Sequence, residues 1–202
     1  MINNLYNEIG SKSVREIEII TDSLLNSHNL NKIPVDIEIL CDKLDVYIAP
    51  VPGLSRATSI EGFLSFQPQP VIYVDDVQPE VRIRFTIAHE LGHYILHASV
   101  LKQISFSSTD EWKIAVQQLP EHVIKRAEKQ AWIFGAAVLM PRHLVINELK
   151  NMRPLIDAAS EISTVSGEII DYVAPKLARK FDVSNSAMIK RIKGMETDIF
   201  SV

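Results

Sequence analysis

Two histidines four residues apart, with a glutamate directly after the first, place the strongest constraint on this chain: His89-Glu90-Leu91-Gly92-His93. In an α-helix a step of four residues turns about 400°, so both imidazoles return to one face, about 6 Å apart. That spacing suits two ligands of one tetrahedral Zn²⁺, and the glutamate stands where it can act as a general base toward a water on the ion. The pattern therefore predicts a helix that carries a metal-dependent hydrolytic site.

The residues around this motif favour a helix. Apolar side chains recur at helical spacing from Ile83 to Ile95, and Pro79 followed by Glu80 is typical of a first helical turn. Gly92 is unfavourable inside a helix by about 1 kcal/mol relative to alanine, so we expect another backbone to pass close by it. The alternative is a buried amphipathic helix with two incidental histidines, because a motif with three fixed letters in five recurs by chance.

A tetrahedral site that keeps one position open needs a third protein ligand. Glu128 is the best candidate, because it stands at the polar start of a second apolar helix that continues through Ala131 to Met140. It could instead be a solvated glutamate among charged neighbours. His97 competes, since it continues the four-residue series from His93, but three turns climb about 12 Å and drift around the helix. We therefore expect His97 to be a core histidine or a partner of a ligand.

Four ordered blocks of the sequence resemble the ImmA/IrrE metallo-endopeptidases. Residues 85–97 are similar to the signature helix of that family, and residues 128–141 to its second block. The segments 61–64 and 70–75 resemble the strands before the signature helix, and 177–191 resembles the closing helices. The resemblance covers about residues 35–193, and four blocks in order are far more specific than one.

The resemblance implies a zincin-like fold in which Zn²⁺ is held by His89, His93 and Glu128, with Glu90 as the catalytic base. It also implies a selective endopeptidase that cleaves a helix-turn-helix transcriptional repressor of a mobile element or a stress response. The family usually has Asn or Asp where this chain has Trp132, a position from which a polar side chain can orient a zinc-ligating histidine. This departure keeps a further interpretation open: a pseudoenzyme, in which a zincin fold binds a partner with weak or absent hydrolysis.

The pattern along the chain predicts an α+β fold, with a small, mostly antiparallel sheet beside the HExxH helix and additional helices at both ends. Ser13 is a typical cap for a first helix that extends to Leu30, and Pro34 is expected to open a second helix. Short strands are predicted at 46–50, 60–66 and 71–75. We expect three parts: an N-terminal helical segment (1–34), a metallopeptidase domain (35–160) and a C-terminal helical hairpin (161–202).

Two segments are candidates for contact with a polypeptide substrate. Residues 61–66 are expected to form a free sheet edge that binds an extended chain through main-chain hydrogen bonds. Residues 101–120 join the two zinc helices and include a polar stretch, Ser105–Asp110, that could form a lid. Three side chains remain alternatives for a donor to a developing oxyanion: Tyr94, His143 and Arg153.

The C-terminal segment supports a rival function, DNA binding. Residues 176–193 carry six basic side chains against Asp182 alone, and the order helix, turn, helix resembles a DNA-binding hairpin. In the alternative interpretation the hairpin packs on the peptidase domain and its charges form a solvated face. Loss of DNA binding on substitution of Lys190 and Arg191 would favour the rival function.

Composition agrees with a compact soluble protein. The 202 residues, of which 47% are hydrophobic and 23% charged, are enough for one domain with a substantial core. The net charge of -4 gives no general signal for nucleic acid or an anionic membrane. Cys41 is the single cysteine, which excludes an intrachain disulfide, and the first residues lack a secretion signal. We therefore expect a cytoplasmic protein without a membrane span.

Overall fold

The computed structural model describes residues 9–102, 120–162 and 166–195 of the chain, and within them the architecture is α+β, as expected. Most of the segment considered as a lid, including Ser105–Asp110, lies outside the described residues. In chain order the elements are α2 (Val14–Ser27), α3 (Ile37–Lys43), β1 (Tyr47–Pro50), α4 (Leu54–Thr58), β2 (Gly62–Ser65), β3 (Val71–Val74), α5 (Glu80–Leu101), α7 (Glu121–Leu139), α8 (Arg142–Asn151), α9 (Arg153–Ile162), α10 (Ser166–Phe181) and α11 (Asn185–Lys193).

The sheet is small and mixed. Its strand order is β1-β3-β2, with β1 parallel and β2 antiparallel to the central strand. Alternate residues of β2 and β3 are buried, among them Leu64 and Ile72, as period-2 strands with one covered face require. On the other face the rings of Phe63 and Tyr73 stack with their centroids 4.7 Å apart. Because β3 is central, β2 is an edge strand.

The two helices before the sheet start where short polar side chains can cap them. The Ser13 hydroxyl accepts a hydrogen bond from the Glu16 N–H at 3.2 Å, and the Glu16 carboxylate accepts one from the Ser13 N–H at 2.7 Å, which is the reciprocal capping box. The prediction that Pro34 opens the second helix was wrong. Asp36 caps α3, and its carboxylate accepts a hydrogen bond from the Ile39 N–H at 3.0 Å. The side chain of a proline has no acceptor for a free N–H of the first helical turn.

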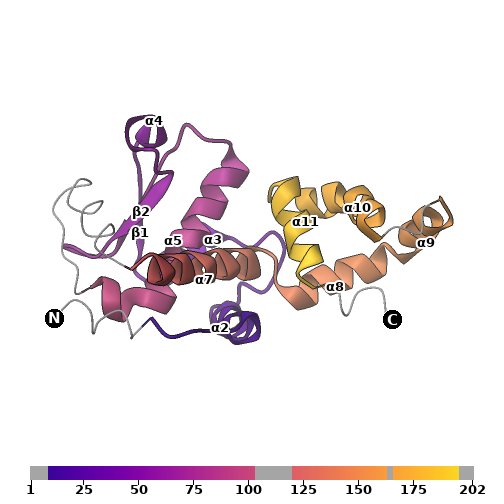
Figure 1. Cartoon of the computed structure of the whole chain (residues 1–202), viewed down its shortest axis with the longest axis horizontal. Helices are drawn as coiled ribbons and strands as arrows, with labels where there is room; N and C mark the ends of the chain where they lie inside the picture. Colours follow the sequence, from indigo (N-terminus) through magenta and orange to yellow (C-terminus); the bar gives the residue numbers. More distant parts are fainter. Residues whose placement is uncertain (1–8, 103–119, 163–165, 196–202) are drawn as a thin grey trace.

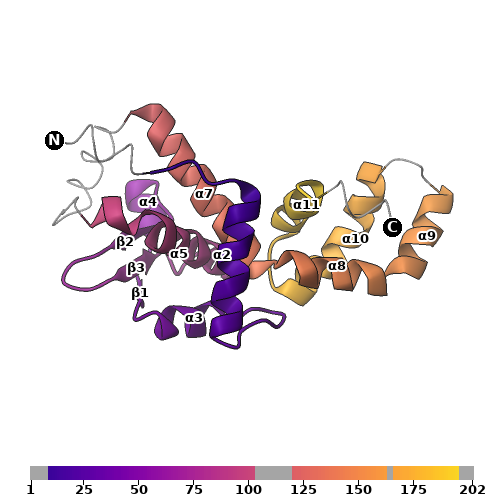
Figure 2. The same ribbon diagram turned by 90° about the horizontal axis from the view of Figure 1, so that it is seen from below.

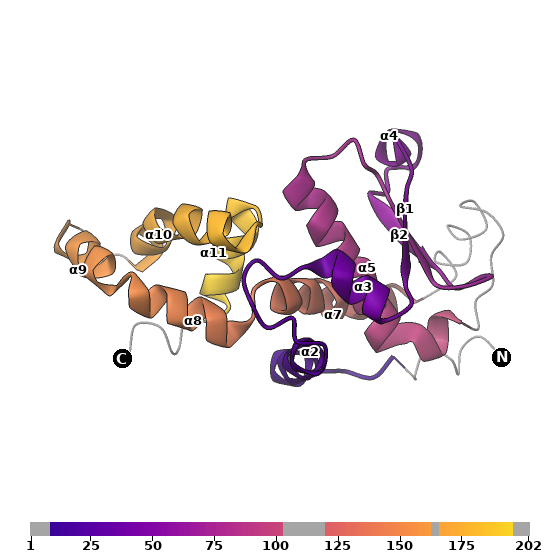
Figure 3. The ribbon, with the colours of Figure 1, turned by 180° about the vertical axis from the view of Figure 1, so that it is seen from behind.

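The long helices α5 and α7 form the centre of the molecule (Figures 1 and 3). The sheet packs against α5, and α2 packs against α7. Two glycines allow the backbones of these helices to approach closely. A Cβ at Gly92 would lie 3.1 Å from both the Cα and the O of Ala131, and one at Gly135 would lie 3.2 Å from the backbone N of His89. The expectation that another backbone passes Gly92 is therefore confirmed, and α7 supplies it.

Helices α8 to α11 gather at the end of the molecule opposite the sheet (Figures 1 and 2). The predicted order of helix, turn and helix is present in α10 and α11, where Ser184 caps α11 by accepting from the Ala187 N–H at 3.2 Å. The expectation that Arg191 is a surface cation was wrong. Its guanidinium lies 2.8 Å from the Glu18 carboxylate of α2, and its Nε donates to the Met140 carbonyl at 3.0 Å. The division into three parts stays a prediction.

Candidate metal centre

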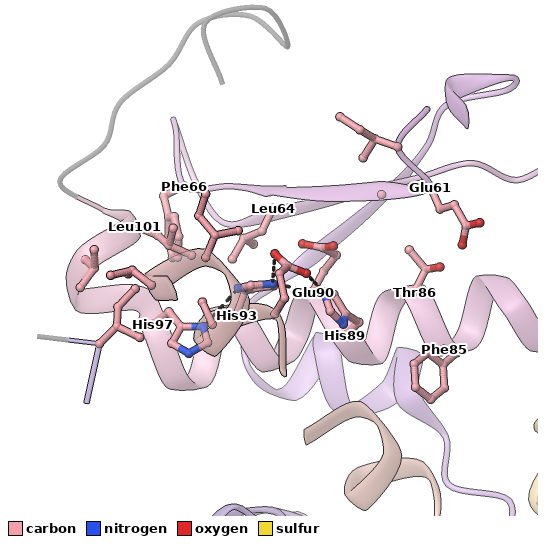
Figure 4. Close-up of a pocket in the computed structure, with 18 residues that line it drawn as sticks. Glu61, Leu64, Phe66, Phe85, Thr86, His89, Glu90, His93, His97 and Leu101 are labelled. Carbon is pink, nitrogen blue, oxygen red and sulfur yellow. Dashed lines mark hydrogen bonds and ion pairs between the residues drawn. The ribbon is translucent and has the colours of Figure 1, made fainter. Parts of the chain in front are cut away.

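Helix α5 presents the HExxH side chains to one cleft. The labelled side chains of His89, Glu90 and His93 rise from α5 into the space below β2 (Figure 4). The two imidazoles face each other, with their Nε2 atoms 3.2 Å apart. The four-residue spacing of the sequence therefore brings both rings to one point, as helical geometry requires.

Glu128 completes the cluster from α7. Its Oε2 lies 3.2 Å from His89 Nε2, and its Oε1 lies 3.5 Å from His93 Nε2. One potential ligand atom from each of the three residues lies within 4.8 Å of the others. Two imidazole nitrogens and one carboxylate oxygen form the donor set of an open zinc site, so these residues fit the ion that the sequence predicts. The Glu128 side chain is 55% exposed, which leaves the cluster open on that side.

The charges of the cluster favour an ionised carboxylate next to basic imidazoles. Burial alone would raise the pKa of Glu128, but hydrogen bonds with His89 and then His93 outweigh it and hold that pKa well below its usual range. Burial would lower the pKa of His89, yet the hydrogen bond to Glu128 and the charge of Glu90 raise it overall. An ionised Glu128 carboxylate beside the imidazoles gives the cluster a negative charge, which favours a bound cation.

Glu90 has the environment of a proton acceptor. Burial in the cleft raises its pKa, although the neighbouring imidazoles of His93 and His89 act in the opposite direction. A raised pKa brings a carboxylate closer to the operating pH, where a general base is most effective. Glu90 lines the same cavity as the three candidate ligands, as the sequence predicts.

The cavity around the cluster has a volume of about 390 Å³ and two unlike ends. The end near the C-terminus of α5 is apolar, with contributions from Leu64, Phe66, Leu101 and Ile9. The opposite end contains Glu61, whose Oε1 lies 2.6 Å from the Arg82 guanidinium of α5, together with Phe85 and Thr86. The space can therefore receive an extended chain with an apolar side chain on one side of the cluster.

His97 lies next to the candidate ligands, in the position of a partner of a ligand. It is 1% exposed, its Nδ1 lies 3.1 Å from His93 Nδ1, and its Nε2 lies 3.1 Å from Gln130 Oε1. Burial, with His93 nearby, lowers the pKa of His97 to about 4, so its ring is neutral at neutral pH. Sequence reasoning missed Gln130, although a single amide directly before the apolar run of α7 was a visible signal.

Trp132 stands where the family usually has a polar side chain, and it has a packing role. Its ring lies 5.9 Å from the Phe85 ring, and the Lys190 ammonium of α11 lies 3.6 Å from its centroid. Trp132 therefore joins α5, α7 and α11 through an aromatic and a cation–π contact. Lys190, one of the two cations considered for DNA binding, is engaged in this contact.

The three candidate oxyanion donors lie outside the described lining of the cavity. Tyr94 stacks on Phe66 at 5.9 Å, and His143 Nε2 lies 2.9 Å from the side-chain oxygen of Asn31. Arg153 pairs with the aspartate one turn later in its helix at 2.8 Å. The choice of an oxyanion donor among the three stays a prediction.

Comparison with known proteins agrees with this geometry. The sequence matches the model of the IrrE N-terminal-like domain, of the M78 peptidase family, over residues 41–193. The chain belongs to this family. The resemblance to the ImmA/IrrE endopeptidases, which rested on the HExxH helix and the block that begins at Glu128, is thereby confirmed. The matched residues include all three candidate ligands. No curated protein sequence is a recognisable relative.

The IrrE-like fold also occurs in a solved structure of a Mycobacterium tuberculosis transcriptional regulator. The two chains are 15% identical and superpose with a TM-score of 0.53 over 95% of this chain. The match takes in 60% of the regulator, so this chain spans less than two thirds of that protein, and the likeness shows the fold alone. Over the described ranges, no helix of the IrrE-like chain combines the length and the apolar character needed to cross a membrane.

Proposed function

We propose that this chain is a zinc-dependent endopeptidase that cleaves a specific transcriptional repressor. The observation that carries the proposal is the convergence of His89, His93 and Glu128 within 4.8 Å, with Glu90 in the same cavity. Membership of a peptidase family supports it. The repressor as substrate follows from the resemblance to the ImmA/IrrE endopeptidases.

In the proposed reaction the three ligands hold the ion and Glu90 moves the proton. A bound Zn²⁺ supplies Lewis-acid chemistry, because it lowers the pKa of water toward about 7 and polarises a carbonyl group. Glu90 takes the proton of the attacking water through its carboxylate and later donates it to the leaving amine. Its raised pKa favours both transfers, since the carboxylate accepts the proton readily and is then an acid of moderate strength.

The edge strand β2 is the proposed binding surface for the substrate backbone. It follows α5 along the cavity: Gly62 packs on Thr86 and Glu90, and Phe66 packs on Tyr94. A Cβ at Gly62 would lie 2.6 Å from the Thr86 methyl group, so only glycine lets the strand lie this close to the helix. An extended peptide that pairs with the free edge of β2 would therefore pass over Glu90 at a defined distance.

DNA binding is the weaker candidate. Of the two cations on which that function depended, Arg191 is buried against Glu18, and Lys190 is exposed but lies over the ring of Trp132. The pseudoenzyme interpretation also has less support, because Trp132 displaces none of the three candidate ligands from the cluster.

Replacement of Glu90 by glutamine tests the proposal. Glu90→Gln should retain zinc and fold, because it removes the base and none of the ligands. Cleavage of a helix-turn-helix repressor that the wild-type protein cleaves should fall by about 10²–10⁴, the usual contribution of a general base. Zinc content is measured by elemental analysis and cleavage by mass spectrometry of the products.

The matched control is Glu80→Gln, which changes an exposed glutamate in the first turn of the same helix and should leave cleavage unchanged. If the biological effect of this protein survives Glu90→Gln unchanged, hydrolysis at this centre is not the function and a binding role replaces it.

A further inference from the structure

A row of polar groups leads from the candidate ligand His93 into the protein interior. His93 Nδ1 lies 3.1 Å from His97 Nδ1, and His97 Nε2 lies 3.1 Å from Gln130 Oε1. Gln130 Nε2 then donates to the Gly10 carbonyl at 2.8 Å. Both His97 and Gln130 are buried, so their hydrogen bonds are made within the protein.

The far end of this row sets the direction of every hydrogen bond in it. A backbone carbonyl only accepts, so the Gln130 group that faces Gly10 is its NH₂, and the group that faces His97 is its oxygen. That oxygen only accepts, so His97 carries its proton on Nε2. A neutral imidazole has one N–H, and His97 Nδ1 is therefore an acceptor toward His93.

The same reasoning reaches the candidate ligand. Because His97 Nδ1 accepts, His93 must donate from its own Nδ1. With that proton on Nδ1, a neutral His93 ring has its lone pair on Nε2, the atom that faces His89 and Glu128. This is the tautomer that a ligand binding through Nε2 requires.

We propose that Gln130 and His97 are positioning residues that select the metal-binding tautomer of His93, and that the Gly10 carbonyl of the N-terminal segment sets their polarity. The proposal rests on the metal site of the proposed function. Under this proposal His97 and Gln130 orient the ligand His93. Position 132, where tryptophan replaces the polar residue usual in the family, has no part in it.

The N-terminal segment is held firmly enough for this role. Arg126 of α7 donates to the Ile9 carbonyl at 3.2 Å, one residue before the Gly10 carbonyl that Gln130 binds. The Ile9 side chain is buried against Val100 and Val123 and forms part of the cavity wall. Two side chains of α7 and one apolar contact therefore fix the carbonyl from which the row starts.

The test compares Gln130→Met with Thr21→Val in the full chain. Methionine has a similar length but no strong acceptor, so the tautomer of His97 is no longer selected. Zinc affinity, measured by competition with a chelator, should weaken about 10–100-fold, as is usual when the partner of a ligating histidine is lost. Thr21→Val removes a buried hydroxyl of α2 that donates to the Glu18 carbonyl, and it should bind zinc within a few-fold of wild type.

A spectroscopic readout separates positioning from simple structural support. Long-range ¹H–¹⁵N NMR of the histidine rings in the zinc-free protein should show the Nε2–H tautomer for His97 and a proton on Nδ1 of His93. Gln130→Met should convert His97 to a mixture. Thr21→Val is the control: it removes a buried hydroxyl that bonds only the Glu18 carbonyl of its own helix, and should leave both tautomers unchanged.

Two results overturn the proposal: His97 in the Nδ1–H tautomer in the wild-type protein, or zinc binding by Gln130→Met as tight as by the wild-type protein. Failure of the proposed function has a different signature. If the wild-type chain binds no zinc, the metal site is wrong, and the tautomers of the zinc-free protein still report on the row itself.

Discussion

Glu128 is the candidate ligand that most needs a test at the scale of single residues, because it comes from a different helix than the two histidines and is half exposed. Glu128→Ala removes one of three proposed donors and should reduce the bound zinc to well below one equivalent in the presence of a micromolar competing chelator. Cleavage should be lost together with the metal.

The control for this substitution is Glu121→Ala in the first turn of the same helix, where the glutamate pairs with Lys125 at 2.6 Å on the surface. A surface pair of this kind contributes little to stability, so zinc content should not change. Full zinc occupancy in Glu128→Ala would show that the third ligand is another residue.

Asp75 provides a prediction about pH. Hydrogen bonds from the hydroxyl and N–H of Ser55, and from the N–H groups of Val77 and Gly53, outweigh burial and hold the pKa of Asp75 well below its usual range. A carboxylate with a depressed pKa stabilises the fold above its unfolded-state pKa of about 4, and this stabilisation is lost as the pH falls toward the folded-state value.

Asp75→Asn should therefore lower the free energy of unfolding most at pH 7, because an amide NH₂ then faces backbone donors. The difference between wild type and variant should narrow as the pH falls from 4 toward 3. Urea unfolding of the zinc-free proteins at several pH values measures it. A difference that is constant over this range would mean that the charge of Asp75 does not contribute.

At the scale of elements, the crossing of α5 and α7 determines whether the ligands meet. Gly92 lies between the two histidines. A Cβ there would contact the backbone of Ala131, and that backbone can move away only if α7 shifts. Alanine in a helix is normally about 1 kcal/mol more favourable than glycine. Here the contact at 3.1 Å opposes that gain.

Gly92→Ala should lower the thermal stability and weaken zinc binding at the same time, because Glu128 on α7 moves away from the histidines. Gly167→Ala in α10 is the matched control, since nothing lies within 4 Å of the Cβ that would be added. That variant should be as stable as wild type or slightly more stable. A Gly92→Ala protein with higher stability and unchanged zinc affinity would contradict the tight crossing.

At the scale of the whole molecule, one buried ion pair joins the first and the last described helices. Glu18 of α2 is 3% exposed and Arg191 of α11 is 6% exposed, with their charged groups 2.8 Å apart. The Arg142 guanidinium approaches the same carboxylate at 3.9 Å. Removal of one partner of a buried pair leaves an uncompensated charge, which commonly costs about 3–5 kcal/mol.

Glu18→Ala should accordingly reduce the free energy of unfolding by about 3–5 kcal/mol, as measured in urea. The double variant Glu18→Leu with Arg191→Met removes both charges and should lose less stability than Glu18→Ala alone. If the single and double variants unfold at the same urea concentration, the pair does not hold the two ends of the chain together.

Local features of the sequence predicted local structure well. The Ser13 cap, the HExxH helix and the three strands depend on residues a few positions apart, and all of them are present. The Pro34 prediction failed because two residue types compatible with a helix start lay close together, and the side-chain hydrogen bond of Asp36 decided between them.

The sequence by itself determined the spacing that brings His89 and His93 to one face, because a helix repeats over neighbouring residues. Only the tertiary structure decided which distant groups meet them: Glu128 from α7, the His97 contact to Gln130 across 33 positions, and the Gln130 contact to Gly10 across 120. The tertiary structure likewise turned Arg191 from a surface cation into a buried one. Such contacts depend on how helices cross, and helix crossing is set by the packing of whole surfaces, which no local spacing encodes.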